Sequence, residues 1–222
     1  MEVRTQLFKS SAREALADAR LQSALDNIQA GFPRKRRLAV EGLPEFECLR
    51  EHGTAVRDHA IAHLDTYLER FEARVAEQGG TVHWARDAAE ACAAVTAICR
   101  EAGARVVTKG KSMATEEIAL NEHLSEAGFT PVETDLGEYI VQLRGDKPSH
   151  IIAPAIHLRR EQISEAFRAH HDPADQSGSD DHAALQAEAR RVLRRQFLAP
   201  DVGITGANFL VAETGTSVIV TN

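Results

Sequence analysis

Cysteine is scarce in this sequence, and the few cysteines form no cluster. Cys48, Cys92 and Cys99 make an odd number and fit neither a CxxC nor a CxxxC motif. This pattern argues against a disulfide framework and indicates a reducing compartment. Three separated cysteines also do not supply the ligands of a metal site or an iron–sulfur cluster. We therefore expect buried free thiols and no metal site in this chain.

Long apolar runs and an excess of positive charge are also missing. No apolar run approaches the ~20 residues that a membrane helix needs, and the N-terminal segment lacks the apolar core of a signal peptide. The formal net charge of -7 argues against broad nucleic-acid binding, which usually requires a basic face. These absences predict a cytoplasmic protein with no membrane span and no nucleic-acid partner.

The N-terminal part of the chain has helical periodicity and no strand pattern. Apolar residues recur at helical spacing up to a stop signal at Gly31 and Pro33. The basic run at residues 34–37 is either a solvated linker or a docking segment for an acidic partner. A second helix is expected over residues 54–78. We therefore predict that residues 1–78 form a helical N-terminal extension.

Strand and helix patterns alternate after this extension, which predicts the α/β fold class. Such alternation implies βαβ units and a mostly parallel sheet. The expected strands are 81–85, 105–108, 130–133 and 149–153, and the expected helices are 87–102, 115–127, 159–170 and 181–198. Residues 171–180 should form an exposed loop, and residues 207–220 a β-hairpin. Residues 79–222 are assigned to one α/β domain.

Lys109, Gly110, Lys111 and Ser112 lie between an expected strand and an expected helix. Glycine would let the backbone approach a ligand, and the two lysines with the amides of the helix start would favour an anion. The segment is neither GxxxxGK[ST] nor GxGxxG. The alternative is an ordinary helix start capped by a hydroxyl side chain, and Glu116 in the first turn would partly oppose an anion.

Three carboxylates, Glu133, Asp135 and Glu138, gather just after the expected strand 130–133. Ligands of open α/β folds bind at the carboxyl ends of strands. Paired acids at this place could bind hydroxyls or a cation, or act in acid–base chemistry. The alternative is helix capping, because DLGE matches a capping box that begins at Asp135.

Two further segments carry candidate residues. His157 lies just past the expected strand 149–153, at the ligand edge, although a lone histidine is more often a structural hydrogen-bonding group. Glu213 in the expected hairpin could act as a nucleophile, a base or a hydroxyl binder. Asn208, Thr214 and Gly215 accompany it, and the alternative is an ordinary hairpin turn.

Five strings of residues, taken in order, resemble the LUD (lactate utilisation) domain family. They are HWARDAAEA (83–91), KGKSMATEEIALN (109–121), ETDLGEYIVQL (133–143), PSHIIAPAIH (148–157) and GITGANFLVAETGT (203–216). The resemblance covers nearly the whole chain, from about Phe8 to Asn222, and is closest to the N-terminal half of the family's iron–sulfur B-type members.

The resemblance implies a three-layer α/β/α arrangement that is NagB/RpiA/CoA-transferase-like, a group that binds sugar phosphates, CoA esters or folates at its strand ends. It also implies a cytoplasmic complex with two partner proteins that oxidises L-lactate to pyruvate. Members of this type continue into a region with [4Fe–4S] clusters. This chain has no cysteine cluster, so either it is truncated before a C-terminal iron–sulfur region, which is our expectation, or it has lost electron transfer.

The functional hypothesis is a ligand-binding domain of such a complex, inactive by itself, that binds a small organic acid. Lys109 or Lys111 would bind the carboxylate, and His157, Glu213 or Asp135 would be catalytic. One alternative is an independent isomerase or CoA-transferase-like enzyme that acts on a phosphosugar or a thioester. The other is a non-catalytic scaffold that docks partners. The fold likeness by itself does not transfer an active site.

Overall fold

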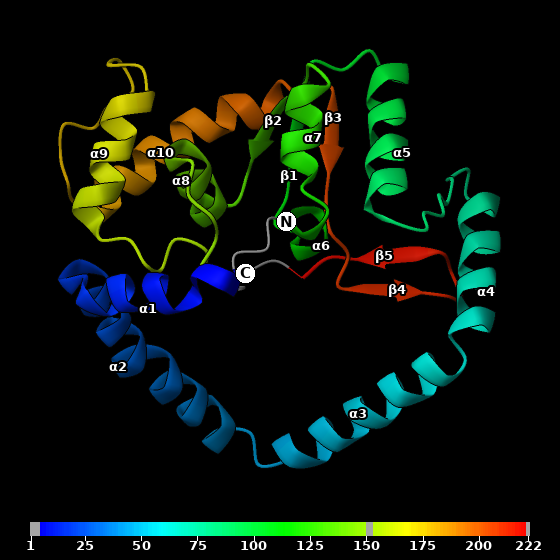
Figure 1. Ribbon diagram of the computed structural model, residues 1–222. Coiled ribbons are helices and arrows are strands. Elements are labelled where there is room, and N and C mark those ends of the chain that lie inside the picture. The colour runs from blue at the N-terminus through cyan, green and yellow to red at the C-terminus, as the bar shows by residue number, and fades with distance from the viewer. Residues whose placement is uncertain (1–4, 150–152, 221–222) are drawn as a thin grey trace. The chain divides into compact units, whose positions relative to one another are not determined.

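The computed structural model describes residues 5–149 and 153–220 (Figure 1). The chain divides into two compact units. The sheet unit comprises residues 1–29 and 85–205, and the hairpin unit comprises residues 30–84 and 206–222. The expected boundary between residues 78 and 79 stays a prediction. None of the helices within the described residues is both long and apolar enough to cross a membrane.

The sheet unit is organised around three parallel strands. These are β1 (Val106–Lys109), β2 (Thr130–Glu133) and β3 (Val202–Ile204), in the order β2-β1-β3. The register pairs Lys109 with Glu133 on one side and with Ile204 on the other. All three strands therefore end at the same edge of the sheet, and the prediction of a mostly parallel sheet is confirmed.

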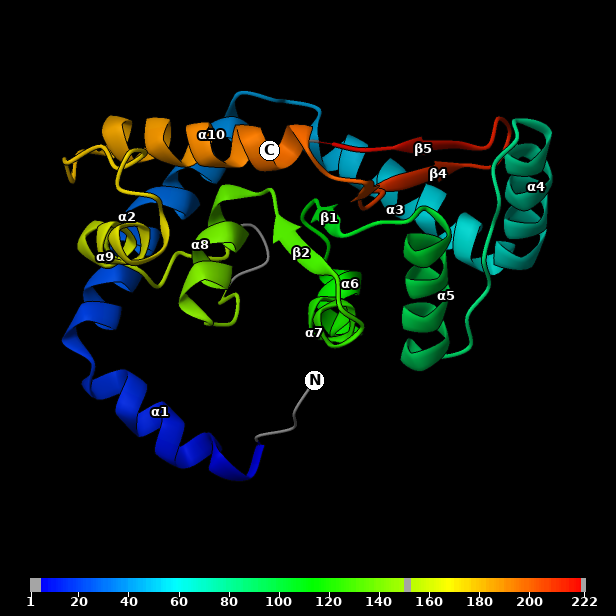
Figure 2. The same cartoon turned by 90° about the horizontal axis from the view of Figure 1, so that it is seen from above.

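Helices pack on both sides of this sheet, as the view from above shows (Figure 2). In chain order they are α5 (Ala88–Glu101), α6 (Met113–Glu117), α7 (Leu120–Glu126), α8 (Leu136–Arg144), α9 (Arg160–His170) and α10 (His182–Leu198). Figure 2 shows α6 and α7 on one side of the sheet and α10 on the other. This mixed α/β architecture is consistent with the expected three-layer α/β/α fold.

Two apolar clusters hold these layers together. One joins α5, α7 and β1 through Cys92, Cys99, Val107, Leu120, Leu124 and Phe129. The other joins α8, α9 and α10 through Tyr139, Ile140, Phe167, Leu185, Ala189 and Val192. The prediction of buried free thiols is thus confirmed for Cys92 and Cys99, whose pKa values are raised by burial. It is wrong for Cys48, which is exposed.

After a short 3-10 turn at Thr5–Leu7, the N-terminal part consists of helices joined by short turns. Its helices are α1 (Phe8–Ala17), α2 (Ala19–Glu41), α3 (Phe46–Ala62) and α4 (Leu64–Glu77). The expected stop at Gly31 and Pro33 is wrong, because α2 continues through both. Pro33 is exposed there, so water can bind the carbonyl that loses its helical donor. The predicted second helix is divided between α3 and α4, and Gly79 ends α4 with a positive φ of 82°.

The alternating part holds both confirmed and wrong predictions. The expected helix 115–127 is broken between α6 and α7, where Ala119 has a φ of 53°. Residues 81–85 form no strand, since this segment pairs with no strand and Trp84 is 60% exposed. The expected strand 149–153 lies largely outside the described residues. The hairpin is confirmed as β4 (Phe209–Val211) and β5 (Thr216–Val218), which are antiparallel.

The segment 171–180 is a loop, as its polar sequence predicts, but it is not exposed throughout. His171 and Asp175 are both buried. The Tyr139 hydroxyl lies 3.0 Å from His171 Nε2, and His171 Nδ1 lies 2.7 Å from Glu188 Oε1. Arg195 of α10 forms an ion pair with Asp175. The polar residues of this segment are therefore used to attach it to α8 and α10.

Candidate functional site

A buried ionic cluster lies where β1 and β2 end. Lys109, the last residue of β1, is only 1% exposed. Its Nζ lies 2.8 Å from Glu133 Oε1 and donates a hydrogen bond of 2.9 Å to Thr115 Oγ1. Because Lys109 and Glu133 are register partners, their side chains project from the same face of the sheet. The parallel pairing thus brings together two residues that are far apart in the sequence.

Two more polar side chains complete this cluster from α7 and α8. Asn121 Nδ2 donates to Glu133 Oε1 over 2.6 Å. Glu138, in the first turn of α8, is 3% exposed. Within the described residues, neither oxygen of Glu138 has a hydrogen-bond donor, and Glu133 Oε2 has none either. Two ionised carboxylates are both acceptors, so the pair can form a hydrogen bond only when one of them carries a proton.

Burial raises the pKa of Glu138 to about 8. The neighbouring Glu133 raises the pKa further through a hydrogen bond and its charge, the Lys109 charge lowers it, and a hydrogen bond with Glu116 raises it. Glu138 therefore keeps its proton at neutral pH, so it adds no negative charge beside the Lys109–Glu133 ion pair. A buried carboxyl group with this pKa can give or take a proton near neutral pH.

The other residues after β1 have local structural roles. The Gly110 amide donates to Ile204 O over 2.8 Å, so it connects the segment to β3. Ser112 is the N-cap of α6, and its Oγ accepts from the Thr115 amide, which favours the capping interpretation. Lys111 lies between Gly110 and Ser112 in the sequence and is half-buried. Of the residues predicted to bind a substrate or anion, Lys109, Glu116 and Glu138 contribute to the buried cluster.

Asp135 and His157 make local contacts instead of joining the cluster. Asp135 Oδ1 accepts from the amides of Gly137 and Glu138 over 3.0 and 3.2 Å, so it is the N-cap of α8. His157 Nδ1 lies 2.6 Å from Ser149 Oγ, and its Nε2 lies 3.9 Å from Asp146 Oδ2. The geometry favours a capping role for Asp135 and a structural one for His157. Their catalytic roles stay predictions.

The four candidates of the hairpin unit are positioned by the β4–β5 hairpin. Asn208 Oδ1 accepts from the Val220 amide, and Thr214 Oγ1 donates to Thr216 Oγ1. Gly215 has a φ of 72°, and a Cβ there would lie 2.8 Å from the backbone of Arg74 in α4. These contacts favour a turn role for all but Glu213. Glu213 lines a largely apolar groove of about 670 Å³ between the hairpin and helices α3 and α4.

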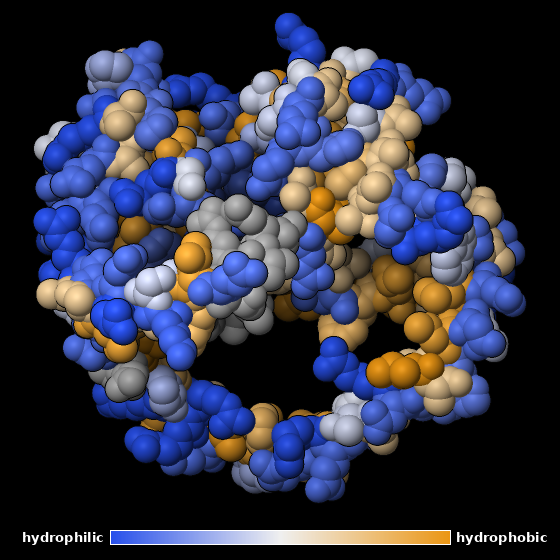
Figure 3. Space-filling view, in the orientation of Figure 1, coloured by the Kyte–Doolittle hydropathy of each residue, from blue (hydrophilic) through white to orange (hydrophobic). Residues whose placement is uncertain are grey.

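Apolar side chains gather at this groove, and Figure 3 shows them over α4 and the β4–β5 hairpin. Exposed members include Val56, Leu64, Leu210 and Val211. The groove offers Glu213 a mostly apolar surrounding and offers a polar ligand few partners. A role for Glu213 in covalent chemistry stays a prediction.

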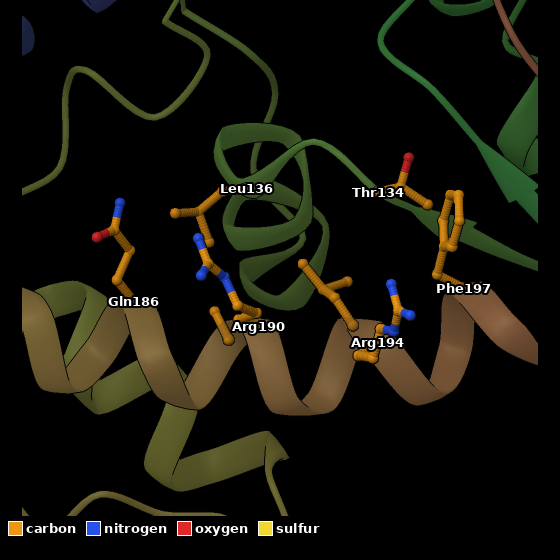
Figure 4. A pocket seen from close by; sticks show the side chains of 8 residues that line it. Thr134, Leu136, Gln186, Arg190, Arg194 and Phe197 are labelled. Carbon is orange, nitrogen blue, oxygen red and sulfur yellow. The ribbon is translucent and has the colours of Figure 1, made fainter.

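The sequence analysis missed a pocket in the sheet unit. It lies at the same edge of the sheet as the buried cluster. It has a volume of about 370 Å³ and lies between α10 and the segment after β2. Figure 4 shows Arg190, Arg194 and Phe197 on α10, opposite Thr134 and Leu136. The sequence shows four arginines within residues 190–195, which could have indicated an anion site. Only the folded structure shows which of them face the pocket.

The donor set of this chain does not fit an iron–sulfur cluster. Cys92 and Cys99 lie in the apolar core of the sheet unit, whereas Cys48 is exposed on α3 in the hairpin unit. Among the described residues, no group of three histidine, cysteine or acidic side chains could hold a metal ion. No step of the chemistry below is assigned to a cluster in this chain.

Comparisons with known proteins place the chain in a family. The LUD domain family model matches residues 68–222. Lactate utilization protein B of Exiguobacterium sp. is 41% identical over 97% of this chain and 45% of its own length. The Bacillus velezensis protein of that name is 40% identical over 100% of this chain and 46% of its own. Escherichia coli has a relative named "Uncharacterized electron transport protein YkgF", 39% identical over 97% and 45%.

No solved structure matches the chain. The chain spans about half the length of the curated relatives it matches. The family model covers well over half of the chain, and the relatives are similar over nearly all of it. The chain therefore belongs to the LUD domain family.

Proposed function

We propose that this chain binds a small organic acid, L-lactate, and accepts the proton of its hydroxyl group during lactate oxidation. The names of the relatives support a role in lactate utilisation. The observation that carries the chemical part is the buried Glu133–Glu138 pair at the carboxyl ends of parallel strands, with one carboxyl pKa at about 8. Strand carboxyl ends are where α/β folds bind ligands, and perturbed acids gather at functional sites.

The reaction sets the chemistry that such a site must provide. Oxidation of L-lactate to pyruvate breaks the O–H and Cα–H bonds and releases two protons and two electrons. The hydroxyl proton requires a base, and the Cα proton leaves with both electrons for acceptors outside this chain. In this proposal the ionised form of Glu138 takes that proton, because its pKa near neutrality suits general base chemistry. Lys111, half-buried just after β1, pairs with the substrate carboxylate. Lys109 holds Glu133 in position.

Access to the buried pair requires movement of the segment that covers it. The short helix α6 and the left-handed Ala119 after it are suited to such a movement. A non-glycine residue at positive φ is strained, and strain of this kind concentrates at functional sites. In the proposal, α6 shifts about Ala119 to admit the acid.

The electrons leave for carriers outside this chain. We extend the proposal to a cytoplasmic complex in which two partner proteins and a region with [4Fe–4S] clusters accept them. The relative named as an electron transport protein supports this extension. Because the cysteines of this chain do not fit a cluster, the extension assigns none of its residues to electron transfer.

Calorimetric titration of the purified protein with L-lactate and pyruvate at pH 8, in buffers of different ionisation enthalpy, tests the proposal. An anion bound beside Glu138 should raise the pKa of that carboxyl further, so binding should take up protons. Glu138→Gln should bind without proton uptake, and Lys111→Ala should not bind. Lys147→Ala, an exposed lysine in a loop, is the matched control and should bind normally.

Other outcomes would favour the alternatives. If neither acid binds, the proposal is wrong, and tight co-purification with a redox partner would then favour a scaffold. A CoA adduct on Glu213, detected by mass spectrometry, would instead favour the CoA-transferase-like alternative.

A further inference from the structure

The pocket beside α10 carries an inference that does not rest on lactate chemistry. We propose that it binds a phosphate monoester joined to a planar ring, as in a nucleotide. Arg190 and Arg194 bind the phosphate, and the ring packs on Phe197 (Figure 4).

The four arginines of α10 form two pairs with different uses. Arg191 donates to the carbonyl of Asp175, and Arg195 forms an ion pair with the same residue. Arg190 and Arg194 form the other pair, and their guanidinium groups have no hydrogen bond or ion pair within residues 5–149 and 153–220. One pair thus attaches the segment 171–180, and the other faces the pocket.

The second pair lies on one face of the helix. Residues four apart are neighbours on a helix surface, so Arg190 and Arg194 project to the same side. In Figure 4 both rise from α10 toward Thr134 and Leu136. Two like charges at this spacing destabilise a helix slightly, and an anion between them removes that cost. Favourable interaction with the helix dipole accounts for arginines near the C-terminus but not for their convergence on one pocket.

Charge favours a phosphate over a carboxylate. A phosphate monoester carries a charge of about -1.5 to -2 at pH 7, which matches two guanidinium groups. A single carboxylate would leave one of them unbalanced. The planar guanidinium also presents donors in the geometry that phosphate oxygens accept in pairs.

The rest of the pocket favours a ring. Phe197 is 57% exposed, so one face of its ring is open to stacking. Leu136 and Leu193 add apolar surface, and Gln186 adds a hydrogen-bonding group. The volume of about 370 Å³ lies within the range of ligand pockets and is larger than lactate requires. The ligand therefore differs from the organic acid proposed for the buried cluster.

Calorimetric titration of the purified protein with AMP, adenosine and inorganic phosphate tests this inference. AMP should bind more tightly than either of its halves, and its affinity should fall as salt is added. Arg190→Ala and Arg194→Ala should each weaken AMP and phosphate binding by roughly tenfold to a hundredfold. Phe197→Ala should weaken AMP roughly tenfold and leave inorganic phosphate unchanged.

Arg195→Ala is the matched control, because it removes a charge from the same end of α10 but on the face toward Asp175. It should leave AMP affinity unchanged, with circular dichroism to verify that all variants fold. If AMP does not bind, or if Arg195→Ala weakens it as much as Arg190→Ala, the inference is overturned. Equal effects of Phe197→Ala on AMP and phosphate would overturn the role of the ring. L-Lactate binding should persist in the Arg190 and Arg194 variants, so failure of this site is distinct from failure of the lactate proposal.

Discussion

Two glutamates on the inner faces of neighbouring helices, Glu138 of α8 and Glu188 of α10, are equally buried, at 3% and 2% exposure, yet differ in acidity. Burial raises the pKa of Glu138 to about 8. Burial would also raise the pKa of Glu188, but hydrogen bonds from the Ser177 amide and from His171 more than offset it, and the pKa falls below the usual 4.5.

The difference lies in the donors that each carboxyl meets. Glu188 Oε2 accepts from the Ser177 amide over 2.8 Å, and Oε1 lies 2.7 Å from His171 Nδ1. Glu138 faces another carboxylate and finds no donor in the described part of the chain. Equal desolvation therefore leaves Glu188 as a stabilised carboxylate and Glu138 as a carboxyl group that keeps its proton at neutral pH. The first fits a structural role, and the second fits acid–base chemistry.

The largest expected effect is the loss of the Glu188 network. Glu188→Ala would leave His171 and the Ser177 amide without their buried acceptor, so the free energy of unfolding should fall by about 3 kcal/mol. Urea denaturation monitored by circular dichroism measures this change. Glu165→Ala, at an exposed position of α9, is the control and should change stability by less than about 0.5 kcal/mol. If Glu188→Ala changed the free energy of unfolding as little as this control, Glu188 would not have the structural role that distinguishes it from Glu138.

A pH series should separate the two carboxyls by the sign of their effect. Glu138 has a raised pKa, so its contribution to stability is full below the unfolded value near 4.5 and is lost as the pH rises toward 8. Glu188 has a lowered pKa, so its contribution is present above 4.5 and is lost as the pH falls through and below that value. Stability should therefore decline in both directions.

Glu138→Gln isolates the loss of stability at rising pH. The amide cannot ionise, so this variant should gain stability relative to the parent protein between pH 5 and pH 8, where ionisation of Glu138 in the unfolded chain favours unfolding. Unfolding midpoints in urea at several pH values measure the gain. A constant difference between variant and parent across this range would contradict the raised pKa.

The smallest expected effect concerns the strained residue beside the cluster. Ala119 has a φ of 53°, where glycine is favoured over residues that carry a Cβ. Ala119→Gly should therefore stabilise the protein by about 1 kcal/mol. Ala114→Gly, within helix α6, is the matched control and should destabilise the protein by a similar amount. A loss of stability in Ala119→Gly would show that the backbone there is not strained.

Sequence patterns predicted those parts of the fold that local chemistry determines. The strand at residues 130–133 and the helices that follow Asp87 and Asp181 are confirmed, because β-propensity and an acidic N-cap act within a few residues. The passage of α2 through Pro33 and the break at Ala119 were missed. Pro33 is exposed, which makes the first possible, and the left-handed Ala119, which no local sequence pattern marks, produces the second.

The candidate site was predictable only in part, since it depends on strand register. Sequence analysis selected Lys109, Glu116 and Glu138 but assigned Glu138 to a capping box or to ligand binding. The pairing of Lys109 with Glu133 follows from the alignment of β1 and β2, which no local pattern specifies. Likewise, only tertiary packing divides the arginines of α10 between Asp175 and a pocket.

The backbone conformation and surroundings of Gly215 limit which residues the turn of the hairpin accepts at this position. Its positive φ disfavours a side chain, and a Cβ there would lie only 2.8 Å from the Arg74 backbone, too close for an ordinary contact. Two independent constraints thus act on one residue of an otherwise solvent-exposed turn. A library randomised over residues 213–216 and selected for folded protein should return glycine at this position while its neighbours vary freely.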